Sequence, residues 1–103
     1  MLRNQHGDVL LYEAPIPKGA KKVKKDPRGV VLAEGEATGH AHVVTGGSCA
    51  LLEHEGRTFL SVKEPVTVRH QEHKPQVIQP GNYEVKQVRE VDPFSEEVRK
   101  VRD

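Results

Sequence analysis

The sequence has no tryptophan, one cysteine and only four aromatic residues among its 103, and each scarcity excludes something. Cys49 alone cannot form an internal disulfide, so this is not a disulfide-stabilised scaffold. The longest uncharged apolar runs are a handful of residues, far short of the roughly 20 that a membrane helix requires. The net charge is +1, so the chain as a whole is not a polyanion binder, and any such site must be local.

Large apolar side chains are also scarce, which limits the core. Hydrophobic residues make up 35% of the chain and charged residues 30%, whereas soluble domains usually have roughly 45–50% apolar residues, glycine included. The length suits a single domain over residues 1–103. A thin core favours completing burial through a partner or an ion, so we expect a homo-oligomer. No amino-terminal run has the pattern of a secretory signal, so we expect a cytoplasmic protein.

Short apolar runs rich in valine, bounded by glycine or proline, predict antiparallel strands. The runs occupy residues 9–12, 30–33, 40–45, 48–53, 58–62, 66–70, 76–79 and 82–88. Gly46-Gly47 is typical of a two-residue hairpin turn, and Pro80-Gly81 of a type II turn. The fold class predicted is mainly β, a small antiparallel barrel or two-layer sandwich of seven or eight strands.

The chain changes character after residue 90. Asp92-Pro93 is a helix start signal, and Phe94, Val98 and Val101 recur at helical spacing. We therefore expect a short helical segment at 93–102, packed on the sheet or on a neighbouring subunit.

A basic loop spans residues 18–28 and contains a single acid, Asp26. It ends in a turn sequence, Asp26-Pro27-Arg28-Gly29. One interpretation is a contact with phosphates or an acidic partner; the other is a solvated connection, because no aromatic residue is interleaved to stack on bases. The candidate anion-binding residues are Lys18, Lys21, Lys22, Lys24, Lys25 and Arg28.

Two of the six histidines, His40 and His42, share one face of a predicted strand. A hairpin across Gly46-Gly47 pairs His42 with Leu51 and His40 with Glu53, which gathers two imidazoles and a carboxylate on that face. His70 follows the inward valines of the 66–70 strand, and His73 lies in the turn beyond it with Glu72. Neutral imidazoles are common transition-metal ligands. The predicted metal site consists of His40, His42, Glu53, His70 and His73.

Other interpretations of these residues remain open. The histidines are equally consistent with the rims of exposed strands, or with an interface that responds to pH because imidazoles titrate near neutrality. Cys49 is predicted to be a small core residue; a nucleophilic pair with His40 or His42 is the minor alternative.

The run from Gly35 to Glu53, with His40-Ala41-His42 and a later carboxylate, resembles the first motif of the cupin superfamily. Pro80-Gly81 is similar to the turn that opens the second motif. The resemblance implies a small β-barrel that holds a divalent metal such as zinc, nickel, iron or manganese on His40, His42 and Glu53, with His70 or His73 replacing the last histidine. It does not imply one reaction, because the family contains both enzymes and binders. The tail from Asp92 resembles the ends of short uncharacterised bacterial and phage proteins.

The leading functional hypothesis is therefore a small metal-binding β domain. Two hypotheses from other classes remain beside it. One is a structural protein that acts by assembling into a multimer, and the other is an anion-binding module that uses the basic loop.

Overall fold

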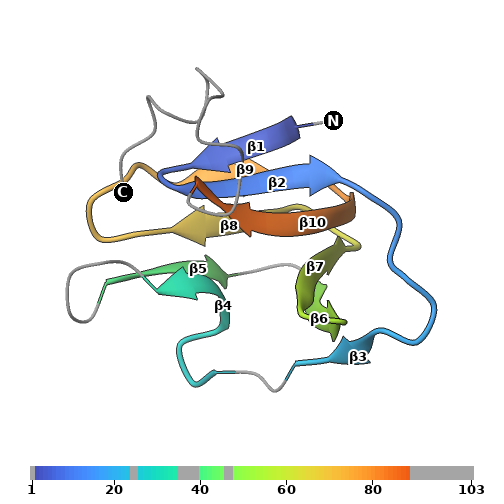
Figure 1. The fold of residues 1–103 in the computed structure, drawn as a ribbon. Coiled ribbons are helices and arrows are strands. Elements are labelled where there is room, and N and C mark those ends of the chain that lie inside the picture. The colour runs from blue at the N-terminus through green and yellow to red at the C-terminus, as the bar shows by residue number, and fades with distance from the viewer. Residues whose placement is uncertain (1, 24–25, 35–39, 46–47, 89–103) are drawn as a thin grey trace.

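The computed structural model describes residues 2–23, 26–34, 40–45 and 48–88, which form two antiparallel sheets (Figure 1). The six-stranded sheet has the order β1 (Leu2–His6), β2 (Val9–Glu13), β10 (Gly81–Gln87), β7 (Arg57–Val62), β6 (Cys49–His54) and β3 (Lys21–Lys22). The four-stranded sheet has the order β4 (Val30–Glu34), β5 (Ala41–Thr45), β8 (Val66–Arg69) and β9 (Gln76–Ile78). The mainly β, antiparallel class predicted from the sequence is confirmed.

Two tight turns fix the registers of the larger sheet. Between β1 and β2, Gly7 has a φ of +61°, the positive value that a type II′ turn requires at its first central residue. Between β6 and β7, Glu55 and Gly56 have φ values of +50° and +77°, as a type I′ turn requires at both positions. Both turn types match the right-handed twist of the strands they join, so the two hairpins form locally.

The core lies between the two sheets and draws on both. It consists of Val9, Leu11, Val30, Leu32, Val44, Leu60, Val62, Val66, Val68, Ile78, Tyr83 and Val85. Leu10 and Phe59 lie outside this cluster, next to Leu11 and Leu60 in sequence, and are also buried. Because neighbouring residues of a strand point to opposite faces, β2 and β7 are covered on both sides.

The sheets approach each other at the β1 and β9 edges without a backbone ladder (Figure 1). Side-chain amides bridge the gap instead. Asn4 Nδ2 donates to the Val77 carbonyl at 3.4 Å, and Gln76 Nε2 donates to the Gln5 carbonyl at 2.7 Å. The described strands therefore form two sheets and not one closed barrel.

The predicted hairpin across Gly46-Gly47 is wrong. β5 pairs with β4 and β8 in one sheet, whereas β6 pairs with β3 and β7 in the other. Both edges of β6 have other partners: β7 pairs along its whole length through the turn at Glu55-Gly56, and β3 and Val23 bond to the opposite edge at Leu51, Leu52 and Glu53. Gly46 and Gly47 themselves lie outside the described residues.

Other expectations have mixed outcomes. The eight predicted strands correspond to β2 and β4–β10, while β1 and β3 were not predicted. Gly81 does not adopt the type II turn, since its φ is +152° where that turn needs about +80°, and it is the first residue of β10. The helix expected at 93–102 lies outside the described residues. Within the part that the structure describes, no helix has the length and apolar character needed to span a bilayer.

Candidate functional site

Five of the six histidines meet at one place, which we call the histidine cluster: His6, His40, His42, His70 and His73. The ring centroids in contact are between 4.4 Å and 5.7 Å apart. The rings come from the end of β1, the start of β5, the residue after β8 and the β8–β9 loop. Segments far apart in sequence thus converge on one group of imidazoles.

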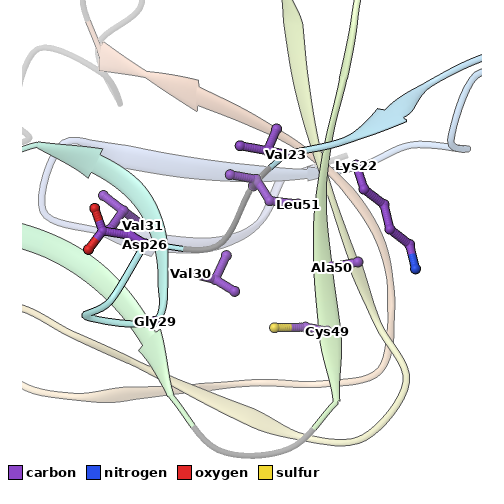
Figure 2. Close-up of a pocket in the computed structure, with 9 residues that line it drawn as sticks. All are labelled: Lys22, Val23, Asp26, Gly29, Val30, Val31, Cys49, Ala50 and Leu51. Atoms are coloured by element: carbon purple, nitrogen blue, oxygen red, sulfur yellow. The ribbon is translucent and has the colours of Figure 1, made fainter.

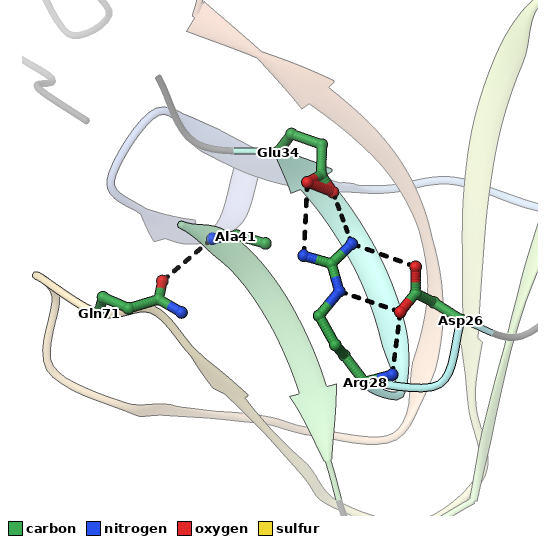
Figure 3. Close-up of polar contacts among 5 residues, drawn as sticks. All are labelled: Asp26, Arg28, Glu34, Ala41 and Gln71. Carbon is green, nitrogen blue, oxygen red and sulfur yellow. Dashed lines mark hydrogen bonds and ion pairs between the residues drawn. The ribbon is translucent and has the colours of Figure 1, made fainter. Parts of the chain in front are cut away.

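Local contacts hold the contributing segments together. The side chain of Gln71 accepts a hydrogen bond from the Ala41 amide at 3.0 Å, which ties the β8–β9 loop to the first residue of β5 (Figure 3). Ala41 lies between His40 and His42, and Gln71 follows His70. This bond therefore joins the two segments that carry three of the five rings.

The outer part of the cluster faces solvent beside Glu72. Nδ1 of His40 lies 3.9 Å from Oε1 of Glu72, and the two side chains are 25% and 60% exposed. Nδ1 of His70 accepts a hydrogen bond from the Glu72 amide at 3.0 Å. When His70 is neutral, its hydrogen is therefore on Nε2.

The inner part consists of His6 and His42, which are 3% and 0% exposed. Their Nδ1 atoms form a hydrogen bond with each other at 2.9 Å. The other nitrogen of each ring has its own partner: Nε2 of His6 lies 2.8 Å from the Lys74 carbonyl, and Nε2 of His42 lies 3.2 Å from Oδ1 of Asp8. A carbonyl only accepts, so Nε2 of His6 carries a hydrogen.

Burial is the largest influence on the protonation of His6. It lowers the pKa of His6 below the ordinary 6.5, because an imidazolium is poorly solvated there. The hydrogen bond to Lys74 acts in the opposite direction, and the nearby rings of His42, His73 and His70 lower the pKa further. His6 is therefore neutral at pH 7, the form that ligates metals.

Gly7 packs directly on the rings. A Cβ at this position would lie 2.7 Å from Nε2 of His73 and 2.9 Å from Cε1 of His42. Real Cβ atoms do not approach so closely, and the φ of +61° also favours glycine. The β1–β2 turn thus closes over the cluster because its first central residue has no side chain.

The structure brings together four of the five predicted ligands: His40, His42, His70 and His73. It does not bring Glu53, which is exposed on β6 opposite Lys21 and Thr58. Three strand spacings separate β6 from β2, the strand that follows Asp8, which is roughly 14 Å. Glu53 was predicted as a ligand because a hairpin across Gly46-Gly47 would place it opposite His40, and that hairpin does not form.

Sequence reasoning missed His6 and Asp8. The available signal was the run His6-Gly7-Asp8, whose glycine suits a tight turn between two strands in a histidine-rich chain. Among the described residues, no three His, Cys, Asp or Glu side chains already converge on a point suited to a metal ion. A metal with three protein ligands would therefore need at least one ring to turn about its side-chain torsions.

The other predicted sites lie away from the cluster. Cys49 packs against the core, as expected, beside a cavity of about 460 Å³ between β4 and β6 (Figure 2). Apolar residues make up most of its wall, namely Val23, Val30, Val31, Ala50 and Leu51. Lys22 and Asp26 also line it.

The basic loop is partly neutralised within the fold. Arg28 donates to Asp26 and to Glu34 at distances from 2.9 to 3.4 Å (Figure 3). The hydrogen bonds from the side chain and the backbone of Arg28 lower the pKa of Asp26 to about 2. Lys18, Lys21 and Lys22 are exposed, and Lys24 and Lys25 lie outside the described residues. An anionic partner at this loop stays a prediction.

One protein-family model matches the chain, over residues 5–88, and its description is a domain of unknown function, DUF8820. The match contains every histidine of the cluster. No curated protein and no solved structure matches the chain.

Proposed function

The chain belongs to the DUF8820 family, whose description assigns no function, and from the geometry we propose that it binds a divalent transition metal at the histidine cluster. The observation that carries the proposal is the convergence of five imidazoles, two of them almost fully buried. Imidazole nitrogens are common ligands of transition metals, and the cluster gathers five such rings from segments that lie far apart in sequence.

The donor set also indicates the class of metal. Imidazole nitrogens suit zinc, copper, nickel and iron, whereas magnesium and calcium prefer sites built from oxygen. Two carboxylates, Asp8 and Glu72, lie beside the rings and offset part of the charge of a divalent ion. Nδ1 of His40 is buried without a hydrogen bond to any described residue, so one nitrogen is available to a ligand.

The proposal keeps the predicted ligands His40, His42, His70 and His73 and omits Glu53. We also propose that the site is cupin-like, because the resemblance to the cupin superfamily implies a metal held by strand histidines on a small β domain. Assembly into a homo-oligomer is a separate prediction, because all five rings of the cluster come from one chain.

Metal analysis and thermal unfolding of protein purified without an affinity tag test this proposal. We expect near-stoichiometric zinc, copper, nickel or iron, or uptake of one ion by the metal-free protein. At a free metal concentration 100 times Kd, binding adds about 2.7 kcal/mol of stability. For a domain of this size that raises Tm by roughly 10–20 °C.

The double variant His40→Ala/His42→Ala should lose the metal and the shift in Tm. The matched control is His54→Ala, which removes a half-buried histidine on β6 away from the cluster. Circular dichroism of each variant checks whether the sheets still form. Absence of metal uptake by the wild-type protein, or equal uptake by the double variant while it is folded, would refute the proposal.

A further inference from the structure

The cavity of about 460 Å³ lies between β4 and β6, two strands that belong to different sheets (Figure 2). β4 is an edge strand, and beyond β6 its own sheet has only the two-residue β3. On this edge, β6 bonds to β3 and to Val23, whose amide donates to the Leu51 carbonyl at 2.7 Å. The cavity opens beyond this contact, next to Cys49 and Ala50.

The side chains that enter the cavity from the strands are apolar or weakly polar. Cys49 and Leu51 are two residues apart on β6, so both point to the side of β4, as Figure 2 shows. Both also pack against the hydrophobic core, to which Val30 of β4 belongs. The side chain of Lys22 points to the other side of β6 (Figure 2). Its ammonium group therefore lies away from the cavity.

The turn from Asp26 to Gly29 borders the cavity, and its charges are paired. These two residues exchange two backbone hydrogen bonds, at 3.2 and 2.9 Å. Arg28 Nε donates to Asp26 Oδ1 at 3.0 Å, and Nη2 of the same guanidinium donates to Glu34 Oε2 at 2.9 Å (Figure 3). One positive charge thus serves two carboxylates, which disfavours a negatively charged ligand beside this turn.

The cavity has the size and the lining of a ligand site. Packed interiors leave few voids larger than a water molecule, whereas small-molecule sites usually measure roughly 300–1,000 Å³. Water in such a space needs several polar partners, which the valine and leucine side chains do not supply. An apolar molecule that displaces this water is favoured by the hydrophobic effect.

We propose that the cavity binds a neutral, mainly apolar small molecule, which contacts Val30, Cys49 and Leu51. The apolar wall selects the body of the ligand, and the paired turn selects against negative charge. This site is separate from the proposed metal site, because none of the five clustered histidines is among the described residues that line it. The inference therefore goes beyond the proposed function and does not depend on it.

Two dyes with the same aromatic rings test the chemical class of the ligand. N-phenyl-1-naphthylamine is neutral, and its fluorescence rises in apolar surroundings. We expect it to bind saturably, with one dye per chain. 8-Anilinonaphthalene-1-sulfonate adds a negative charge and should bind about tenfold more weakly or worse. Equal affinity for the two dyes would overturn the neutral class of ligand.

A pair of variants tests the location of the site. Cys49→Phe places a ring in the cavity, so we expect it to weaken binding of the neutral dye about tenfold or more. Ser61→Phe is the matched control, because it adds a ring to a residue of similar size on the same hairpin. Ser61 pairs with Ala50, so its side chain lies on the face turned away from the cavity. The control should bind the neutral dye as the wild type does.

The wild-type thiol supplies a second measurement. Cys49 is the only cysteine of the chain, so its reaction with iodoacetamide reports on this cavity alone. At a concentration of neutral dye about ten times Kd, we expect the thiol to react about tenfold more slowly, because only the fraction without dye reacts. This measurement needs no variant, and it decides the assignment if Cys49→Phe does not fold.

Three results would contradict the assignment. One is absence of binding of the neutral dye, and another is equal binding by folded Cys49→Phe. The third is a thiol that reacts equally fast with and without the dye. Each of them leaves the proposed metal site unaffected, because that site is tested by metal uptake and by different variants.

Discussion

Among the residues that the structure describes, charged or imidazole side chains are buried in two places, and their partners differ. At one place, Glu84 is 8% exposed and accepts two hydrogen bonds from Arg57, at 2.9 and 2.8 Å. These bonds lower the pKa of Glu84, so the carboxylate remains charged and paired. At the other place, the histidine cluster, the inner rings of His6 and His42 present the same kind of nitrogen to each other.

The two places differ in the kinds of group that they bring together. The Arg57–Glu84 pair joins opposite charges with two parallel bonds, and Arg57 also lies 5.2 Å from the centre of the Phe59 ring. Nothing further is needed to satisfy it. The cluster gathers rings of one kind, whose inner pair is joined by a single hydrogen bond between Nδ1 atoms, and it is the place to which the proposed metal binding applies.

The largest loss of stability is expected from Gly7→Ala, and the matching change in the other hairpin turn, Gly56→Ala, should cost less. Gly7→Ala adds a Cβ that would overlap His73 and His42, at a residue with φ of +61°, so we expect a loss of about 2–4 kcal/mol in unfolding free energy. Gly56→Ala, in the turn before Arg57, has a φ of +77° but no atom within 4 Å of the added Cβ. It should cost only about 1 kcal/mol. Urea unfolding of both variants checks the difference, and equal losses would contradict tight packing at Gly7.

A smaller effect is expected from breaking the ion pair. Glu84→Gln keeps the shape of the side chain but replaces a charged acceptor, and the solvent exposure of Arg57 reduces the loss, so we expect about 1 kcal/mol. Metal binding at the cluster should be unchanged. Unfolding curves with and without copper measure both quantities; a change in copper affinity would show that the two places are coupled.

The smallest expected effect is the change in unfolding free energy as the pH falls from 7 to 6. The pKa of His6 is lower in the folded protein than the ordinary 6.5, so below that pH the unfolded chain takes up a proton that the folded chain refuses. Stability should therefore be retained above pH 6.5 and fall as the pH drops below it, by at most about 0.7 kcal/mol for this group between pH 7 and pH 6.

For Glu84 the pKa is lowered from 4.5, so its contribution is lost only at more acidic pH. In the metal-free protein, His6→Gln should reduce the change in unfolding free energy between pH 7 and pH 6. Glu84→Gln should leave that change unaltered. A slope equally steep in His6→Gln would contradict the assignment to His6.

Local patterns were enough to predict most strands and four of the clustered histidines. The valine-rich runs of β4, β5 and β8 have enough β-branched residues to be recognised, and His70 follows the inward valines of its strand. Pairing partners were harder to predict. Gly46-Gly47 and Glu55-Gly56 both suit a hairpin with β6, but only the second forms, and the other edge of β6 pairs with β3, a strand of two lysines that no pattern indicated.

Two parts of the site were beyond local reasoning. β1 has a single apolar residue, Leu2, in its sequence and forms because β2 supplies its backbone partners. The contact between His6 and His42 spans 36 positions and crosses from one sheet to the other, so no spacing within a strand encodes it. A buried ring pair of this kind depends on how the sheets are stacked.

The bridge between β1 and β9 has a mechanical consequence. Strands joined by a ladder cannot slide without breaking register, whereas two amide side chains, those of Asn4 and Gln76, can re-form their bonds over a range of offsets. The relative position of β1, which ends in His6, and β9, which follows the loop that holds His73, is therefore set by side chains and not by a backbone register.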